Sequence, residues 1–100
     1  MDKNFVKDVD KFYAQVFPLR DRARRIIREF VEDNNGAYEF DTENEDFVWV
    51  GEECYAAKIM KDNNDNILVF NSNGYSEYLH DMSPYYILEL ALYCAENANN

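Results

Sequence analysis

Apolar residues recur every three or four positions near both ends of this sequence and gather in short runs between turn residues in its middle. The first spacing is that of an amphipathic helix, and short apolar runs bounded by turns are typical of strands. A chain of 100 residues has room for one domain with one modest core. We therefore expect an α+β fold in a single domain over residues 1–100, with helical structure over 1–34 and 83–97 and an antiparallel sheet over 37–79.

The N-terminal third carries one apolar stripe on each side of Pro18. The stripe before it consists of Phe5, Val6, Val9, Phe12, Tyr13, Val16 and Phe17, and the stripe after it of Leu19, Ala23, Ile26, Ile27, Phe30 and Val31. At about 100° per residue, continuing the helix through Pro18 displaces the second stripe by only about 40°. No capping residue stands directly before Pro18 to begin a new helix. The sequence therefore predicts one long helix kinked at Pro18, with a helix pair as the alternative, ending near Asn35 and Gly36.

Short apolar segments separated by turn residues follow this helix. They cover residues 37–41, 47–50, 54–61, 67–70 and 75–79. Turns this short favour antiparallel neighbours, so we expect a meander of three to five strands.

Two patterns indicate more apolar surface than a single layer of helices on a sheet needs. One predicted strand has Phe47 and Trp49 on one side and Val48 and Val50 on the other, whereas a sheet with one face in water alternates more cleanly. In the last helix, which begins at Ser83, apolar residues cover an arc of about 200°. We favour helices on both faces of the sheet; the alternative is a second molecule that covers one face.

Charge is distributed unevenly along the chain, whose net charge is −10 at pH 7. Residues 1–28 hold eight Lys and Arg against four acidic residues, and residues 29–100 hold two against sixteen. Binding of nucleic acid through the body of the domain is therefore disfavoured, because phosphate contacts need clustered basic residues. No stretch approaches the roughly 20 apolar residues of a spanning helix, and the first residues lack the apolar segment of a secretory signal. We expect a soluble, cytoplasmic protein that binds no membrane.

Residue types that carry catalysis or bind cofactors are scarce. The three glycines form no phosphate-binding loop, His80 is the only histidine, and no nucleophile motif surrounds any serine. Asp62, Asn64 and Asn66 imitate the start of a calcium-binding loop, but the glycine and the final glutamate of that loop are missing. We interpret this segment as a hairpin turn. The sequence predicts no catalytic residue, no cofactor, no metal and no small-molecule substrate.

The sequence has two cysteines, Cys54 and Cys94. Their separation matches neither a metal-ligand pattern nor a C-x-x-C redox motif. We expect two reduced residues that pack as small apolar groups, with a disulfide between them as the alternative.

Two groups of residues are candidates for contacts with other molecules. The chain's five arginines lie within nine residues, and a candidate basic face consists of Arg20, Arg24, Arg25 and Arg28. Acidic residues alternate with them at helical spacing, so we favour a solvated, salt-bridged face over an anion site. Large aromatic residues, which are enriched at interfaces, form a candidate interaction surface of Tyr75, Tyr78, Tyr85, Tyr86, Tyr93 and Trp49.

These patterns favour a small non-catalytic protein-interaction domain that forms a homodimer through a sheet face or the last helix. The alternative is an acidic inhibitor, of the immunity or nucleic-acid-mimic type, because a strongly negative field selects basic partners. A carboxylate-using enzyme would require a concave pocket that holds acidic groups with perturbed pKa values.

Overall fold

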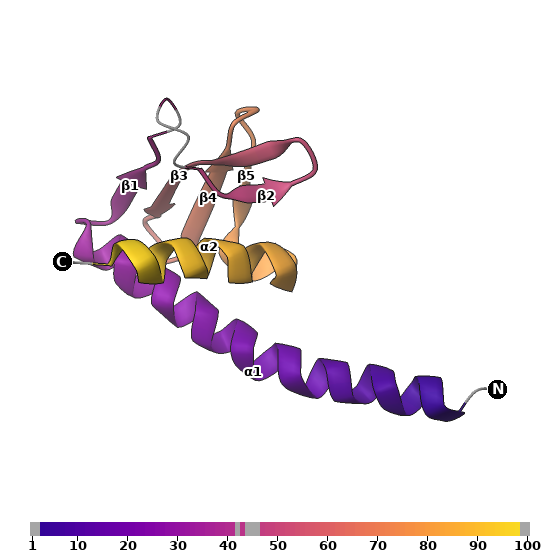
Figure 1. Cartoon of the computed structure of the whole chain (residues 1–100). Helices are drawn as coiled ribbons and strands as arrows, with labels where there is room; N and C mark the ends of the chain where they lie inside the picture. Colours follow the sequence, from indigo (N-terminus) through magenta and orange to yellow (C-terminus); the bar gives the residue numbers. More distant parts are fainter. Residues whose placement is uncertain (1–2, 42, 44–46, 99–100) are drawn as a thin grey trace.

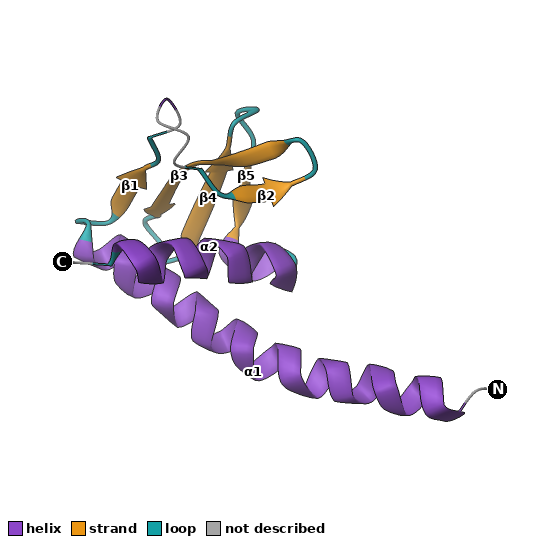
Figure 2. Cartoon of the chain, viewed as in Figure 1, coloured by secondary structure: helices purple, strands orange, loops and turns teal. Residues whose placement is uncertain are grey.

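The computed structural model describes residues 3–41, 43 and 47–98. Its elements follow the order helix, strands, helix (Figures 1 and 2), which confirms the predicted α+β class. They are α1 (Lys3–Asp33), β1 (Ala37–Glu39), β2 (Trp49–Gly51), β3 (Cys54–Lys61), β4 (Ile67–Asn71), β5 (Ser76–Tyr78), the single-turn helix η2 (Leu79–Asp81) and α2 (Pro84–Asn97).

The first helix continues through Pro18, so a single helix and not a helix pair is correct. A proline donates no N–H to the carbonyl four residues earlier, and Pro18 is exposed near the middle of α1. The helix ends as expected. Asn35 and Gly36 adopt φ angles of 63° and 90°, and the N–H of Gly36 donates to the carbonyl of Val31 at 2.8 Å. These left-handed residues turn the chain into β1.

The central strand of the sheet is β3. Strands β4 and β5 follow it in consecutive antiparallel pairings, and on its other edge β3 pairs first with β2 and then with β1. A bulge between Ala56 and Lys58 separates these two pairings. The expected meander therefore holds from β2 to β5, whereas β1 joins β3 and not its sequence neighbour β2. With eight residues, β3 is long enough to pair with two strands of three residues each.

Both helices lie on the same side of the sheet (Figure 2). Between the helices and the sheet, Ile27 of α1, Leu90 of α2 and the strand residues Ile59, Ile67 and Val69 are buried in one core. The favoured expectation that helices cover both sheet faces is therefore wrong. The apolar residues of α1 and α2 pack partly against each other and partly against the sheet. The wide apolar arc of α2 is therefore explained by contact with two neighbours on one side of the sheet.

The opposite face of the sheet bears the other set of apolar strand residues. Met60, Leu68 and Tyr78 are direct neighbours across three strands, with Phe70 in the next row. All four are partly exposed. The two-sided pattern of the sequence thus corresponds to one buried face and one half-exposed face, the latter interrupted by Lys58.

Candidate functional site

An apolar groove opens between α1 and α2 and has no strand residue in its lining. It holds about 260 Å³, and we call it the helix groove. Its walls include Leu19 and Ile26 of α1 and Leu88 and Leu92 of α2, and the buried alanines Ala23 and Ala91 lie between them. Leu19 is 48% exposed and Leu92 is 59% exposed. Large aliphatic side chains at this exposure, gathered around one groove, are typical of a contact surface.

The first half of α1 extends well beyond the sheet and α2 (Figure 1). We call residues 3–17 the arm. No other helix or strand in the described part of the chain lies beside it (Figure 1), and Phe5 near its tip is 66% exposed. The helical backbone of the arm agrees with the spacing from which the sequence predicts one apolar stripe along this segment. An isolated helix of this length is marginal in water, and an apolar stripe on it calls for a covering surface.

Tyr93 belongs to the core. It is 8% exposed, its hydroxyl lies 2.8 Å from that of Tyr38, and the centroid of its ring is 4.9 Å from that of Phe40. The prediction that Tyr93 contributes to a contact surface is therefore wrong, because the buried side of α2 extends far enough around the helix to include it. Tyr86, two turns earlier on the same side, is partly buried against the same core.

The other candidate aromatic residues are exposed but dispersed. Tyr75 lies in the turn between β4 and β5, Tyr85 near the start of α2, and Trp49 on β2 beside Phe47, with ring centroids 5.5 Å apart. Tyr78 stacks on His80 at 5.2 Å between ring centroids. The structure therefore does not bring the predicted aromatic set together into one surface.

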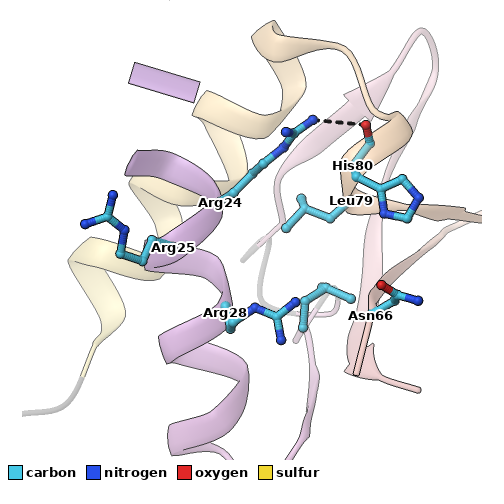
Figure 3. A pocket seen from close by; sticks show the side chains of 7 residues that line it. Arg24, Arg25, Arg28, Asn66, Leu79 and His80 are labelled. Carbon is cyan, nitrogen blue, oxygen red and sulfur yellow. Dashed lines mark hydrogen bonds between the residues drawn. The ribbon is translucent and has the colours of Figure 1, made fainter. Parts of the chain in front are cut away.

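The candidate basic face borders a second pocket, of about 280 Å³, whose lining includes Arg24, Arg28 and His80 (Figure 3). Arg24 donates a hydrogen bond to the backbone carbonyl of His80 at 3.0 Å. Arg25 also lines the pocket, with its guanidinium group directed away from those of Arg24 and Arg28 (Figure 3). Arg20, the fourth arginine of the face, lies 3.8 Å from the carboxylate of Asp21.

Carboxylates compete for these arginines. Arg28 lies 3.4 Å from Asp65 and 4.0 Å from Glu32, and Lys61 lies 3.3 Å and 3.8 Å from the same two acids. Arg24 lies 3.9 Å from Asp21. Arg20, Arg24 and Arg28 of the basic face therefore lie within ion-pair distance of carboxylates, and the choice between a solvated face and an anion site stays a prediction. An anion entering the pocket would compete with Asp65 and Glu32 for Arg28.

The calcium-like segment is a hairpin turn, as interpreted from the sequence. Oδ1 of Asp62 accepts the N–H groups of Asn64 at 2.9 Å and of Asn66 at 3.0 Å. The hydrogen bond from Asn66 is the main cause that lowers the pKa of Asp62, and the hydroxyl of Tyr78 also donates to this carboxylate, which raises the pKa of Tyr78. Among the described residues, no three His, Cys, Asp or Glu side chains are grouped closely enough to hold a metal ion.

Both cysteines are free thiols, so the disulfide alternative does not apply. Cys54 is partly buried on β3, and Cys94 is fully buried on α2. Burial raises the pKa of the Cys94 thiol to about 12. This thiol therefore packs in the core as a neutral, unreactive group.

Alkaline pH is expected to destabilise the fold through Cys94. The thiol loses its proton near pH 9 in the unfolded chain and near pH 12 in the folded protein, so its stabilising contribution is intact below about pH 9 and decreases above it. We expect the wild type to lose up to about 1.4 kcal/mol more per pH unit than Cys94→Ala between about pH 9 and 12. Urea unfolding across this interval measures the difference, with Cys54→Ala as the control. If the free energy of unfolding depends equally on pH in the wild type and in Cys94→Ala, the pKa of the Cys94 thiol is not raised in the folded protein.

Comparison with protein-family models, with curated proteins and with solved structures gives no match for this chain. Among the described residues, no helix is both long and apolar enough to span a membrane. Leu19 and Leu92 of the helix groove were not among the predicted site residues. Their signals in the sequence were the apolar stripe beside Pro18 and the wide apolar arc of the last helix.

Proposed function

We propose that this protein is a small protein-interaction domain that self-associates through the helix groove and the arm. The observation that carries the proposal is the exposed apolar surface of the helix groove, with Leu19 and Leu92 about half exposed on its two walls. A hydrophobic groove between helices is the kind of surface into which the apolar face of an amphipathic helix docks. The arm adds a helix segment beside which Figure 1 shows no other helix or strand of the described chain, and Phe5 near its tip is 66% exposed.

The helix groove supports the proposal better than the outer face of the sheet does. Met60, Leu68 and Phe70 on that face are only partly exposed, and Lys58 lies in the row of Phe70. Charged residues are depleted in the centre of protein interfaces. Among the described residues that line the helix groove, Arg22 is the only charged one, and the others are leucine, isoleucine and alanine.

Charge bears differently on the two candidate functions. The chain carries −10, and three of the arginines are paired with its own carboxylates, so self-association is argued from the apolar groove and not from charge. The acidic excess supports the second candidate function, an inhibitor or nucleic-acid mimic that binds a basic partner. Salt distinguishes the two: an apolar self-association persists at high ionic strength, whereas binding driven by the acidic field weakens steeply.

Replacing Leu92 with glutamate is expected to raise the dissociation constant of the dimer at least about tenfold, because the charge would be desolvated in the groove. Leu92 is exposed in the single chain, so the fold should be unaffected. Sedimentation equilibrium on the full chain measures the change. Tyr75→Glu is the matched control, since it introduces the same charge at an exposed aromatic residue in the β4–β5 turn. Equal dissociation constants for Leu92→Glu and the wild type would show that the helix groove is not part of the interface.

A further inference from the structure

We infer that the dimer forms by reciprocal exchange of arms: the arm of each copy occupies the helix groove of the other, with the two α1 helices antiparallel about a twofold axis near Pro18. This inference rests on the proposed function and specifies its geometry. The occupant of the groove is therefore the segment 3–17 of a second copy of this chain.

The lengths of the two halves of α1 match this arrangement. Its 31 residues divide at Pro18 into two segments of fifteen, the arm and residues 19–33. Each segment is about 22 Å long at 1.5 Å per residue, and α2, with 14 residues, is about 21 Å long. An antiparallel pair centred on Pro18 therefore places one arm beside the whole of residues 19–33 and of α2 in the partner. Neither arm would extend past the partner's helices.

Symmetry closes this assembly. Each copy provides one arm and one groove, and a twofold axis uses both pairs at once, so no unfilled groove is left to recruit a third chain. The apolar stripe of the arm reaches Phe17, and Leu19 on the wall of the groove follows within two residues. The two contact surfaces therefore adjoin at the proposed axis.

The residue types of the arm suit a stable interface. Its sequence contains four aromatic residues, Phe5, Phe12, Tyr13 and Phe17. Burial of one aromatic side chain removes about 150 Å², so the eight in two exchanged arms would contribute roughly 1,200 Å². A standard interface buries roughly 1,600 Å² in total.

Charge does not oppose insertion of the arm. Residues 1–17 hold three lysines and three aspartates and are neutral in sum, whereas the whole chain carries −10. Two such chains repel each other over most of their surfaces. A neutral arm is the segment that approaches an acidic partner without this repulsion.

Disulfide trapping on the full chain tests the geometry. The antiparallel register places position 12 of one arm near Leu92 of the partner's α2. Phe12→Cys and Leu92→Cys are prepared separately in a Cys54→Ser background, which leaves only the buried Cys94 thiol besides the introduced one. The two variants are mixed and oxidised. We expect at least a tenfold excess of covalent heterodimer over the control mixture of Phe12→Cys with Tyr75→Cys.

The outcomes separate this inference from the proposed function. Heterodimer in the test mixture, together with self-linking of Leu19→Cys beside the axis, supports arm exchange. A dimer by sedimentation that gives no link between positions 12 and 92 overturns arm exchange and leaves the self-association intact. A chain that is monomeric under the same conditions overturns both.

Discussion

Replacing Ile27 with alanine is expected to lower the free energy of unfolding by about 2–5 kcal/mol. Ile27 lies on α1 in the core shared by α1, α2 and the sheet, and none of its surface is exposed. Truncation removes buried apolar area and leaves a cavity that helices held by the sheet can close only in part. Because a domain of this size is stabilised by only about 5–15 kcal/mol, the variant should approach its unfolding threshold.

Urea unfolding followed by circular dichroism measures the effect of Ile27→Ala on the single chain, at a protein concentration below the dissociation constant of the proposed dimer, since self-association stabilises the folded state by mass action. Leu19→Ala is the control: it removes an aliphatic side chain from the same helix at a position that is 48% exposed. We expect the control to change the stability of the single chain by less than about 1 kcal/mol. Similar losses of stability for Ile27→Ala and Leu19→Ala would contradict the difference in burial between these two positions of α1.

Replacing Tyr93 with alanine is expected to destabilise the fold by about 3–5 kcal/mol, by analogy with the loss of other buried aromatic rings. Tyr93→Phe isolates the contribution of its hydroxyl. It removes the partner at 2.8 Å from the hydroxyl of Tyr38 and leaves that group in a partly buried site, at a cost of about 1–3 kcal/mol.

The double variant Tyr38→Phe/Tyr93→Phe tests the hydroxyl pair by a double-mutant cycle. Because neither hydroxyl is then left without its partner, we expect the double variant to lose less stability than the sum of the two single variants. Additive losses would mean that the two hydroxyl groups do not interact. No measurable loss of stability for Tyr93→Ala would show that Tyr93 is exposed, as the sequence pattern had predicted.

Local patterns in the sequence predicted the elements well, because caps, turns and apolar spacing act over a few residues. The end of α1 at Asn35 and Gly36, its passage through Pro18 and the bounds of β3 all follow from such signals. Partners distant in sequence were not predictable in the same way. The pairing of β1 with β3 depends on the length and the bulge of β3, which are properties of the assembled sheet.

The candidate site shows the same limit. Tyr93 appeared polar-facing because helical spacing gives the angle between side chains but not which side of α2 meets the core. The helix groove exists only once α1 and α2 lie on the same face of the sheet, so Leu19 and Leu92 carried no signal of their own. The sequence showed that the chain has an excess of apolar surface. Where this surface lies depends on how α1 and α2 pack, which the sequence does not show.

The mass of the full chain in solution tests the central claim most directly. Light scattering over a concentration series, at low and at high salt, should give twice the mass of one chain and little dependence on salt, because the proposed interface is apolar. The mass of a single chain at every concentration up to several hundred micromolar would contradict self-association through the helix groove and the arm.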